Sequence, residues 1–526
     1  MRAKGLLTLS ALALAISANV QSQVMPAYQT TSTWYTGAQT NITNKLARTQ
    51  TDKAKNVILF VGDGMGVSTL TAARILQGQR NGASGEEGYL SFEEYPYTAL
   101  VKTYNVDAQT PDSAGTMTAM MSGIKTDVGT IGVDEDIVRG DCTSVFGNEV
   151  ITALEWAEVK GLATGLVSTA RITHATPAAT YAKSADRNWE DNSDMPQAAI
   201  DAGCADIASQ LVNFEANLEA RIAGIDVDGI EVAMGGGRRH FLPKDTAFNV
   251  EKDVAAGEEG DRTDGRDLTA EWTSRYPNGV YVTDQAGFDA IDTESTERVL
   301  GLFNESHMQY ESDRANDIAG EPSIAEMTVA AINILDNDDD GFFLMVESGR
   351  IDHSHHAGSA YGALNDTIAF AEAIQAADEA TGDDTLILVT ADHGHVFTIA
   401  GYPKRGNPIL GKVVPVGSTT ESLAADGLPY TTLGYMNGMG FAEMTDETDP
   451  DARYGLDIDS GRKDLTSVDT QNVGFHQEAL IPLSSETHSG EDISLHAKGP
   501  GAYKAQGTIE QNVVFHIIRE ALGLDQ

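Results

Sequence analysis

The chain has 526 residues, of which 41% are hydrophobic and 21% charged, and its formal net charge is −43 at pH 7. Its length suffices for a large core, and its acidity argues against a nucleic-acid-binding surface, because phosphate backbones are bound by positive surfaces. It has only two cysteines, so any zinc has to be held by histidine and carboxylate rather than by a thiolate cage.

The first 22 residues have the pattern of a secretory signal peptide. An apolar run over residues 5–18 follows two basic residues and is too short to span a bilayer comfortably. Cleavage is predicted after Ala18 or Ser22, and an uncleaved anchor is the alternative. We therefore expect an exported protein, periplasmic or extracellular, whose mature chain of residues 23–526 has no membrane span and a net charge of about −45.

Five short apolar runs, rich in β-branched or aromatic residues, are spread along the chain. They cover residues 56–61, 165–168, 230–234, 341–346 and 385–390. Taken as strands with helical segments between them, they predict an α/β layer fold with a largely parallel central sheet. From about residue 402 to 485 the pattern loosens into Gly, Pro, Thr and Asp, which indicates an inserted region packed on the main domain.

Polar side chains follow four of these runs. Asp63 comes after the first, His174 and Thr176 after the second, Glu347 at the end of the fourth, and Asp392 after the fifth. Ligands of open α/β sheets collect beyond the carboxyl ends of the strands. These positions are therefore where a site is expected.

The Asp63 segment, Gly-Asp-Gly-Met-Gly over residues 62–66, invites comparison with a dinucleotide-binding loop. That fingerprint needs a glycine where this chain has Val67, so the comparison fails. An aspartate between glycines at a strand end suits a bridging metal ligand better.

Ser113 lies in a segment, residues 111–120, that has the features of a helix start. Backbone N–H groups and the helix dipole favour a phosphate group there, although Asp112 or Ser113 as a simple capping residue is the alternative. No Gly-x-Ser-x-Gly elbow surrounds Ser113, which argues against a Ser-His-Asp hydrolase. Activation of this hydroxyl therefore falls to a metal ion.

Two cysteines and one arginine follow in the chain. In an oxidising compartment Cys142 and Cys204 are candidates for a disulfide, with two separate buried thiols as the alternative. Arg187 is a candidate phosphate clamp because guanidinium binds two phosphate oxygens in one plane; a surface ion pair is its alternative.

Seven of the 12 histidines fall in four short stretches that also hold Asp, Glu or Thr. In one of them Asp352 and His356 are four residues apart, so on a helix they share a face and can chelate one zinc ion. Asp392 and His393 can reach a common ion only if the backbone turns sharply, which Gly394 permits. His488 is a distant third contributor, weak by itself.

Taken together these motifs closely resemble those of the alkaline phosphatases, particularly the animal-type branch. The resemblance runs from about residue 55 to the C-terminus, and six motifs carry it in the right order: residues 61–66, 111–115, 185–189, 350–356, 390–397 and 486–492. It implies a doubly wound sheet with helices on both faces and a crown-like region inserted at about 402–485. It also implies a homodimer and a disulfide between Cys142 and Cys204.

The resemblance further implies a role for each site residue. Ser113 is expected to become phosphoserine and Arg187 to clamp the phosphate of small phosphate monoesters. Three metal groups are implied, for two zinc ions and one magnesium ion: Asp352, His356 and His488 for the first zinc; Asp63, Asp392 and His393 for the second; Asp63, Thr176 and Glu347 for magnesium, with His174 close to its water shell.

Two positions depart from the animal branch. Its calcium site has a glutamate after a Leu-Phe pair, where this chain has Asn304, so the calcium pattern is incomplete, and Glu321 is the neighbouring acidic candidate. Thr176 replaces a serine and keeps one hydroxyl oxygen.

The resemblance therefore predicts the activity of an alkaline phosphatase. Its pH optimum is expected to be alkaline, because a metal ion lowers the pKa of bound water to near or somewhat above 7, so the amount of nucleophilic hydroxide grows with pH. Alternatives on the same metal scaffold are a phosphodiesterase, a sulfatase and a phosphoglycerate mutase. A different class is a non-catalytic acidic metal-binding protein, which leaves Ser113 and Arg187 unexplained.

Overall fold

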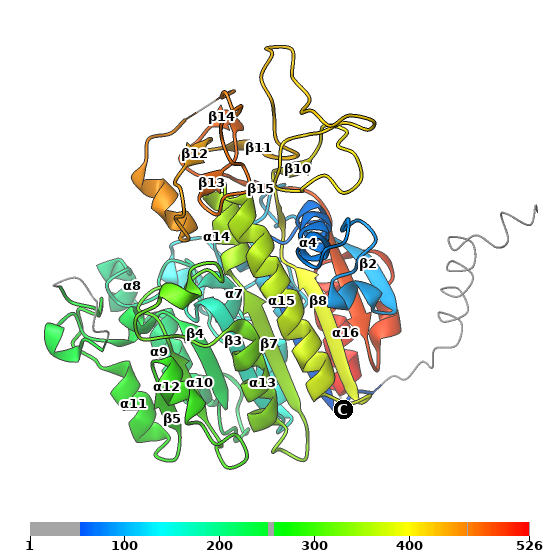
Figure 1. The fold of residues 1–526 in the computed structure, drawn as a ribbon. Coiled ribbons are helices and arrows are strands. Elements are labelled where there is room, and N and C mark those ends of the chain that lie inside the picture. The colour runs from blue at the N-terminus through cyan, green and yellow to red at the C-terminus, as the bar shows by residue number, and fades with distance from the viewer. Residues whose placement is uncertain (1–52, 251–256, 460, 525–526) are drawn as a thin grey trace, which may run out of the picture. The chain divides into compact units, whose positions relative to one another are not determined.

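The computed structural model describes residues 53–250, 257–459 and 461–524; the predicted signal peptide and its cleavage point lie outside them. A ten-stranded sheet runs through the described part (Figure 1). In spatial order its strands are β17 (Gly507–Glu510), β2 (Tyr97–Lys102), β16 (Ile493–Lys498), β8 (Thr385–Ala391), β1 (Asn56–Gly62), β7 (Phe342–Ser348), β3 (Ala163–Arg171), β4 (Val232–Gly236), β6 (Val299–Leu302) and β5 (Val280–Val282).

The sheet is parallel except at β16, which is antiparallel to both β2 and β8. All five predicted strands are confirmed, as β1, β3, β4, β7 and β8. Every residue of β1 is buried, and Val57 pairs with Phe343 on one side and Leu386 on the other. A parallel sheet covered on both faces needs continuous apolar strands, which is why these runs were recognisable.

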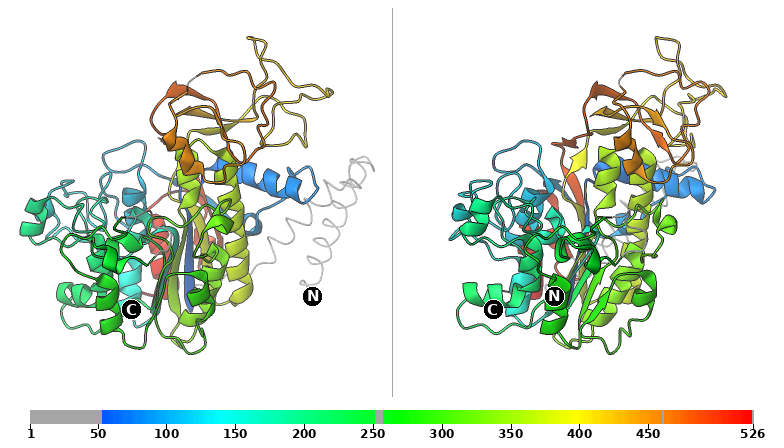
Figure 2. Two further views of the ribbon diagram at one scale, coloured as in Figure 1. Left: turned by 60° about the vertical axis from the view of Figure 1, so that its left-hand side comes forward. Right: turned by 90° about the vertical axis from the view of Figure 1, so that its left-hand side faces the viewer.

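Helices cover both faces of the sheet, which confirms the doubly wound α/β architecture. One group is α4 (Val67–Arg80), α13 (Ile324–Leu335), α14 (Arg350–His356) and α15 (Ala360–Ala380); the other is α5 (Ser113–Ser122), α6 (Ala153–Val159), α7 (Ala175–Ala178) and α16 (Val513–Leu522). The left view of Figure 2 shows α16 and α15 on opposite sides of β1.

Shorter helices surround the β4–β6–β5 end of the sheet. They are α8 (Gln197–Asp201), α9 (Ile207–Val212), α10 (Phe214–Arg221), α11 (Leu268–Arg275) and α12 (Gln285–Asp289). Within the described ranges, each helix is too short or too polar to cross a bilayer.

The region predicted as an insertion carries small sheets of its own. β10 (Phe397–Ile399), β11 (Leu433–Gly438) and β14 (Ala479–Pro482) form one, and β12 (Ala442–Glu443) pairs with β13 (Phe475–His476). Figure 1 shows this segment above α14. It contacts that helix through Tyr435, whose hydroxyl is 2.8 Å from His355 Nδ1, and through Asp451, which pairs with Arg350 at 3.0 Å. Its limits as a separate region, 402–485, stay a prediction.

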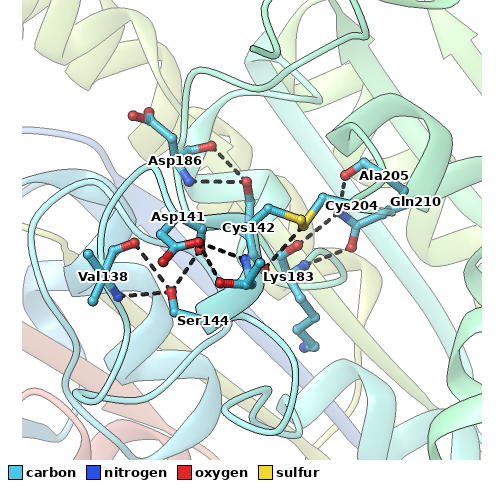
Figure 3. The surroundings of a disulfide bond; sticks show 11 residues. Val138, Asp141, Cys142, Ser144, Lys183, Asp186, Cys204, Ala205 and Gln210 are labelled. Atoms are coloured by element: carbon cyan, nitrogen blue, oxygen red, sulfur yellow. Dashed lines mark hydrogen bonds between the residues drawn. A yellow bond between two sulfur atoms is a disulfide. The ribbon is translucent and has the colours of Figure 1, made fainter. Parts of the chain in front are cut away.

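Cys142 and Cys204 form the predicted disulfide, 62 residues apart in the chain (Figure 3). Cys142 begins a 3₁₀ turn (Cys142–Ser144), and Cys204 follows α8. Nearby, the side chain of Gln210 accepts from the backbone N–H of Lys183 and donates to its carbonyl, at 2.8 and 2.9 Å. The bridge therefore joins the turn at Cys142 to the segment after α8, and Cys142 is buried in a small apolar cluster with Ala185 and Trp189.

Candidate active site

The carboxyl ends of β8, β1 and β7 meet at one edge of the sheet, because neighbouring parallel strands end together. Asp63 follows β1, Glu347 lies near the end of β7, and Asp392 follows β8; all three are fully buried. His393 Nε2 is 3.5 Å from Asp63 Oδ1 and 3.2 Å from Asp392 Oδ2. The structure thus brings together the three residues predicted for the second zinc.

The turn after β8 is held by the side chain of Asp392, and Gly394, predicted to allow a sharp turn there, begins strand β9 (Gly394–His395) and is not among the glycines with positive φ. Asp392 Oδ1 accepts hydrogen bonds from the backbone N–H groups of His393, at 2.8 Å, and of Gly64, at 2.9 Å. Gly64 has φ of +67°, and a Cβ there would lie 2.3 Å from the His395 ring. Only glycine fits this close approach of the β1 turn to the imidazole.

Ser113 is the first residue of α5 and is 2% exposed. Asp112 caps this helix by accepting from the backbone N–H of Gly115 at 3.1 Å. The Ser113 hydroxyl oxygen lies 3.2 Å from His393 Nε2 and 3.4 Å from Asp63 Oδ1. The predicted nucleophile therefore faces the carboxylate and imidazole group at the strand ends, with the α5 N-terminus behind it.

Asp352, His356 and His488 also come together. Asp352 Oδ1 is 3.4 Å from His356 Nε2 and 3.3 Å from His488 Nε2, and the two histidine nitrogens are 3.1 Å apart. The first two share a face of α14, as their spacing predicted. His488 arrives on β15 (His488–Ser489), which pairs with β9 (Gly394–His395).

Sequence reasoning assigned no role to His395 or Glu486, which the structure places in the same group. His395 Nε2 is 2.8 Å from Asp352 Oδ1 and its Nδ1 is 2.5 Å from Glu486 Oε2. Burial lowers the pKa of His395, but Glu486 and Asp352 outweigh it and raise the pKa to about 10. The sequence signal that could have identified His395 was its position two residues after His393. Its carboxylate partners, Asp352 and Glu486, are distant in the sequence.

The residues predicted for magnesium carry polar atoms without a hydrogen-bond partner among the described residues. They are Asp63 Oδ2, His174 Nδ1, Thr176 Oγ1 and Glu347 Oε1. Glu347 Oε2 accepts from the Ser168 hydroxyl, and burial raises the pKa of Glu347 to about 8. Burial, and then Asp392, raise the pKa of Asp63 well above its usual value. Buried, unpaired carboxylates are costly, so this donor set fits a bound cation.

Arg187 lies beside both the serine and the magnesium group. Its Nη1 donates to Asp112 Oδ2 at 3.0 Å, and its Nη2 is 3.1 Å from His174 Nε2. Its side chain is 17% exposed, so part of the guanidinium remains open to a ligand. This position, next to the first turn of α5, suits the predicted phosphate clamp.

A further His and carboxylate group, Asp191, His240 and Asp261, is built differently. His240 Nδ1 is 2.5 Å from Asp191 Oδ2, which is a hydrogen-bond distance, and its Nε2 is 3.2 Å from Glu190 Oε2. The Arg239 Nε lies 3.4 Å from His240 Nε2 and 3.5 Å from Asp261 Oδ2. Both ring nitrogens of His240 therefore have carboxylate partners within the protein, so we assign the group to hydrogen bonding and ion pairing.

At the incomplete calcium pattern, Asn304 and Glu321 lie beside each other. Burial raises the pKa of Glu321 to about 8, and its Oε1 accepts from the backbone N–H of Gln309 at 2.7 Å. Asn304 supplies an amide where the animal pattern has a carboxylate, so this group lacks one anionic ligand of the calcium pattern.

A sequence model of the alkaline phosphatase family matches residues 54–524. The chain is 42% identical over 496 residues to the tissue-nonspecific alkaline phosphatase isozyme of Rattus norvegicus, covering 93% of this chain and 88% of the relative. It is 41% identical over 478 residues to the alkaline phosphatase of Gadus morhua, covering 90% of this chain and 93% of that protein.

Solved structures show the same fold. The Thermus thermophilus alkaline phosphatase superposes with a TM-score of 0.61 at 22% identity, covering 95% of this chain and 96% of the other. The alkaline phosphatase of the Antarctic bacterium TAB5 gives 0.57 at 22% identity, covering 91% and 100%. With the family match over nearly the whole described chain, the protein belongs to the alkaline phosphatase family and is a phosphoric monoester hydrolase.

Proposed function

We propose that Ser113 is the nucleophile of this phosphomonoesterase and forms a phosphoserine intermediate with small phosphate monoesters. The observation that carries the proposal is the position of the Ser113 hydroxyl, 3.2 Å from His393 Nε2 and 3.4 Å from Asp63 Oδ1. It begins α5, where backbone N–H groups favour a phosphate group.

The three donor groups support a set of two zinc ions and one magnesium ion. Asp352, His356 and His488 would hold the first zinc, and Asp63, Asp392 and His393 the second. Asp63, Thr176 and Glu347 would hold magnesium, with His174 beside its water shell. When bound, the ions act as Lewis acids that lower the pKa of a hydroxyl or water and offset negative charge on the reacting oxygens.

The chain's own residues then bind and orient the reacting groups. In the first step the Ser113 oxygen loses its proton and bonds to phosphorus while the bond from phosphorus to the leaving alcohol breaks, and the alcohol takes up a proton. In the second step a water attacks phosphorus in line and gives up a proton, the bond from phosphorus to Ser113 breaks, the Ser113 oxygen takes up a proton, and inorganic phosphate leaves. Arg187 binds two phosphate oxygens in both steps and neutralises part of their charge. An alkaline optimum is expected.

Export and dimerisation complete the proposal. The disulfide between Cys142 and Cys204 supports an oxidising location, periplasmic or extracellular, after removal of the signal peptide. Large apolar side chains are exposed in the crown-like region: Tyr402 at 93%, Val416 at 82% and Leu480 at 68%. Apolar groups in such numbers on one region are typical of an interface, which supports a homodimer formed there.

A labelling experiment tests the nucleophile. Enzyme incubated with radioactive inorganic phosphate and quenched in acid should carry the label on Ser113, and Ser113→Ala should lose both the label and most turnover while keeping its metals. Label on another residue would show that the assignment is wrong.

A turnover assay tests the substrate class. Hydrolysis of a chromogenic phosphate monoester should exceed that of a diester and a sulfate ester. Preference for either of these, or no phosphate release, overturns the proposed substrate class.

A further inference from the structure

Glu190 is a buried carboxylate that lies outside the three metal groups. It is 7% exposed, and its two oxygens accept from Nε and Nη2 of Arg171 at 2.8 and 2.5 Å. Its Oε2 also accepts from the Thr173 hydroxyl at 2.6 Å and lies 3.2 Å from His240 Nε2. A two-pronged guanidinium–carboxylate pair fixes the plane of both groups. Glu190, three residues after Arg187, is thereby locked to the end of β3.

Arg171 extends these contacts toward the active site. Its Nη1 is 2.5 Å from His307 Nε2, and its backbone N–H donates to His307 Nδ1 at 3.2 Å. The centroid of the His307 ring lies 4.2 Å from that of His353 and 5.3 Å from that of His174. His174 Nε2 is in turn 3.1 Å from Arg187 Nη2. None of these contacts was evident from the sequence, because His307 is far from both segments in the chain.

These contacts link Arg187 to His174, His174 to His307, and His307 to Arg171. Arg171 pairs with Glu190, which lies three residues after Arg187 in the chain. We propose that the Arg171–Glu190 ion pair is a positioning element that holds Arg187 and His174 in their working orientation. The proposal rests on the proposed function, since it takes Arg187 as the phosphate clamp and His174 as the neighbour of magnesium. Arg171 and Glu190 act through those residues and need not touch the substrate.

The geometry of Arg187 explains why such a support is needed. A single carboxylate, that of Asp112, binds its Nη1 at 3.0 Å, and the other prong, Nη2, meets only the edge of the His174 ring in the contacts described above. The orientation of the guanidinium plane then depends on where that ring lies. Displacement of a binding group by about 1 Å can cost about a hundredfold in rate.

The charge state of the pair suits a permanent support. Burial raises the pKa of Glu190, but His240 and Arg171 outweigh this and hold it well below its usual value. The carboxylate is therefore ionised throughout the neutral and alkaline pH range. The Arg171–Glu190 ion pair thus acts as a permanent brace for Arg187 and His174. Breaking a buried ion pair also destabilises the fold, so stability alone cannot identify the role.

Glu190→Gln tests the inference, because it keeps the size of the side chain and removes its charge. We expect KM and the inhibition constant of inorganic phosphate to rise about tenfold to a hundredfold, with the zinc content unchanged. The control is Glu231→Gln, which changes a half-buried carboxylate 2.9 Å from Arg298 at the amino end of the same sheet. The control should leave the phosphate inhibition constant unchanged.

A second set of variants separates this inference from the proposed function. Arg187→Ala should itself weaken phosphate inhibition, and adding Glu190→Gln to it should change the constant little further, since the brace acts through Arg187. If Arg187→Ala has no effect, the clamp assignment and the brace both fail. If it has the expected effect but Glu190→Gln has none, or acts equally in both backgrounds, only the brace is overturned. Should Glu190→Gln fail to fold, Arg171→Lys, which keeps the charge but loses the two-pronged geometry, is judged by the same outcomes.

Discussion

Both ends of the central sheet carry carboxylates removed from solvent. At the amino end these carboxylates have hydrogen-bond or ion-pair partners in the protein, whereas at the carboxyl end some of their oxygens have none among the described residues. At the amino end of β3, Glu158 accepts from the Thr164 hydroxyl and from the backbone N–H of Gly229, at 3.1 Å for the latter. Glu231, beside it, accepts from the Thr164 backbone at 2.7 Å and pairs with Arg298. Every one of these contacts is made by the protein itself.

At the carboxyl end, oxygens of Asp63 and Glu347 have no partner among the described residues, and the nearest groups include further acids and imidazoles. Arginines at this end pair with other carboxylates, Asp112 and Glu190, rather than with these two. The difference indicates that the carboxyl end is completed by cations from outside the chain, whereas the amino end needs none. At this end of the sheet, unsatisfied carboxylate, hydroxyl and imidazole atoms thus gather in one group, which is the donor set that a bound cation would satisfy.

Removing metal should have the largest effect and should act on the carboxyl end alone. Exhaustive chelation is expected to abolish phosphomonoester hydrolysis and to lower the thermal midpoint, because the unpaired carboxylates then repel one another. Addition of zinc and magnesium should restore both properties. Activity and bound metal are measured on the same samples, and full turnover after verified metal loss would contradict the comparison.

Metal content sharpens the same point with single substitutions. Glu347→Gln should reduce bound magnesium and lower kcat by roughly a hundredfold, because it removes charge from a site that stabilises the transition state. Glu158→Gln, the counterpart at the amino end, should leave both values unchanged. Equal metal loss in the two variants would mean that the ends do not differ as described.

Neither cysteine belongs to a predicted metal group, so loss of the disulfide should lower stability without affecting the ions. Replacing Cys142 and Cys204 by serine opens a loop with a separation of 62 residues. Loop-closure entropy corresponds to about 4 kcal/mol for a loop of this size, an upper figure that native strain reduces. Denaturant unfolding together with metal analysis checks this, and loss of zinc from the variant would place the bridge in the site's support.

A smaller effect is expected from pH at the amino end. Burial raises the pKa of Glu158 to about 7. The folded state therefore holds a proton that the unfolded state, with a usual glutamate pKa, releases, so this group's contribution to stability falls as pH rises between about 4.5 and 7. In Glu158→Gln the amide can still accept from Gly229 and can donate to Thr164. The thermal midpoint of the variant relative to the parent should rise between pH 5 and 7; a constant difference would show that Glu158 does not titrate there.

Salt should produce the smallest change, since it acts on the surface and on neither end directly. The mature chain, near −45, repels a dianionic ester at low ionic strength, and the Debye length falls from about 10 Å at 0.1 M to about 3 Å at 1 M. Moderate sodium chloride is expected to maintain or raise kcat/KM and to raise the thermal midpoint. A steady fall of both between 0.05 and 0.5 M, at fixed pH and metal, would show that the net charge controls neither.

The sequence by itself determined the strands, the strand-end positions of the site and the local ligand pairs. Strands buried on both faces have to be continuously apolar, so β1, β7 and β8 were visible as runs, and the polar residues after them could be placed at one edge. Asp352 and His356 were paired because helix geometry is periodic. The individual role of each residue came from the family resemblance rather than from the pattern.

Only the tertiary structure decided which distant side chains share an atom-to-atom contact. His395 reaches Glu486 because β9 and β15 pair, and Glu190 reaches Arg171 because the loop that carries Glu190 folds against the last residue of β3. No periodicity links residues that lie on different segments. The residue type alone does not distinguish a histidine or glutamate that has such a partner from one on the surface. The physical reason is that strand and helix patterns reflect local backbone geometry, whereas the arrangement of the metal-binding side chains and of the residues that position them depends on how whole segments pack.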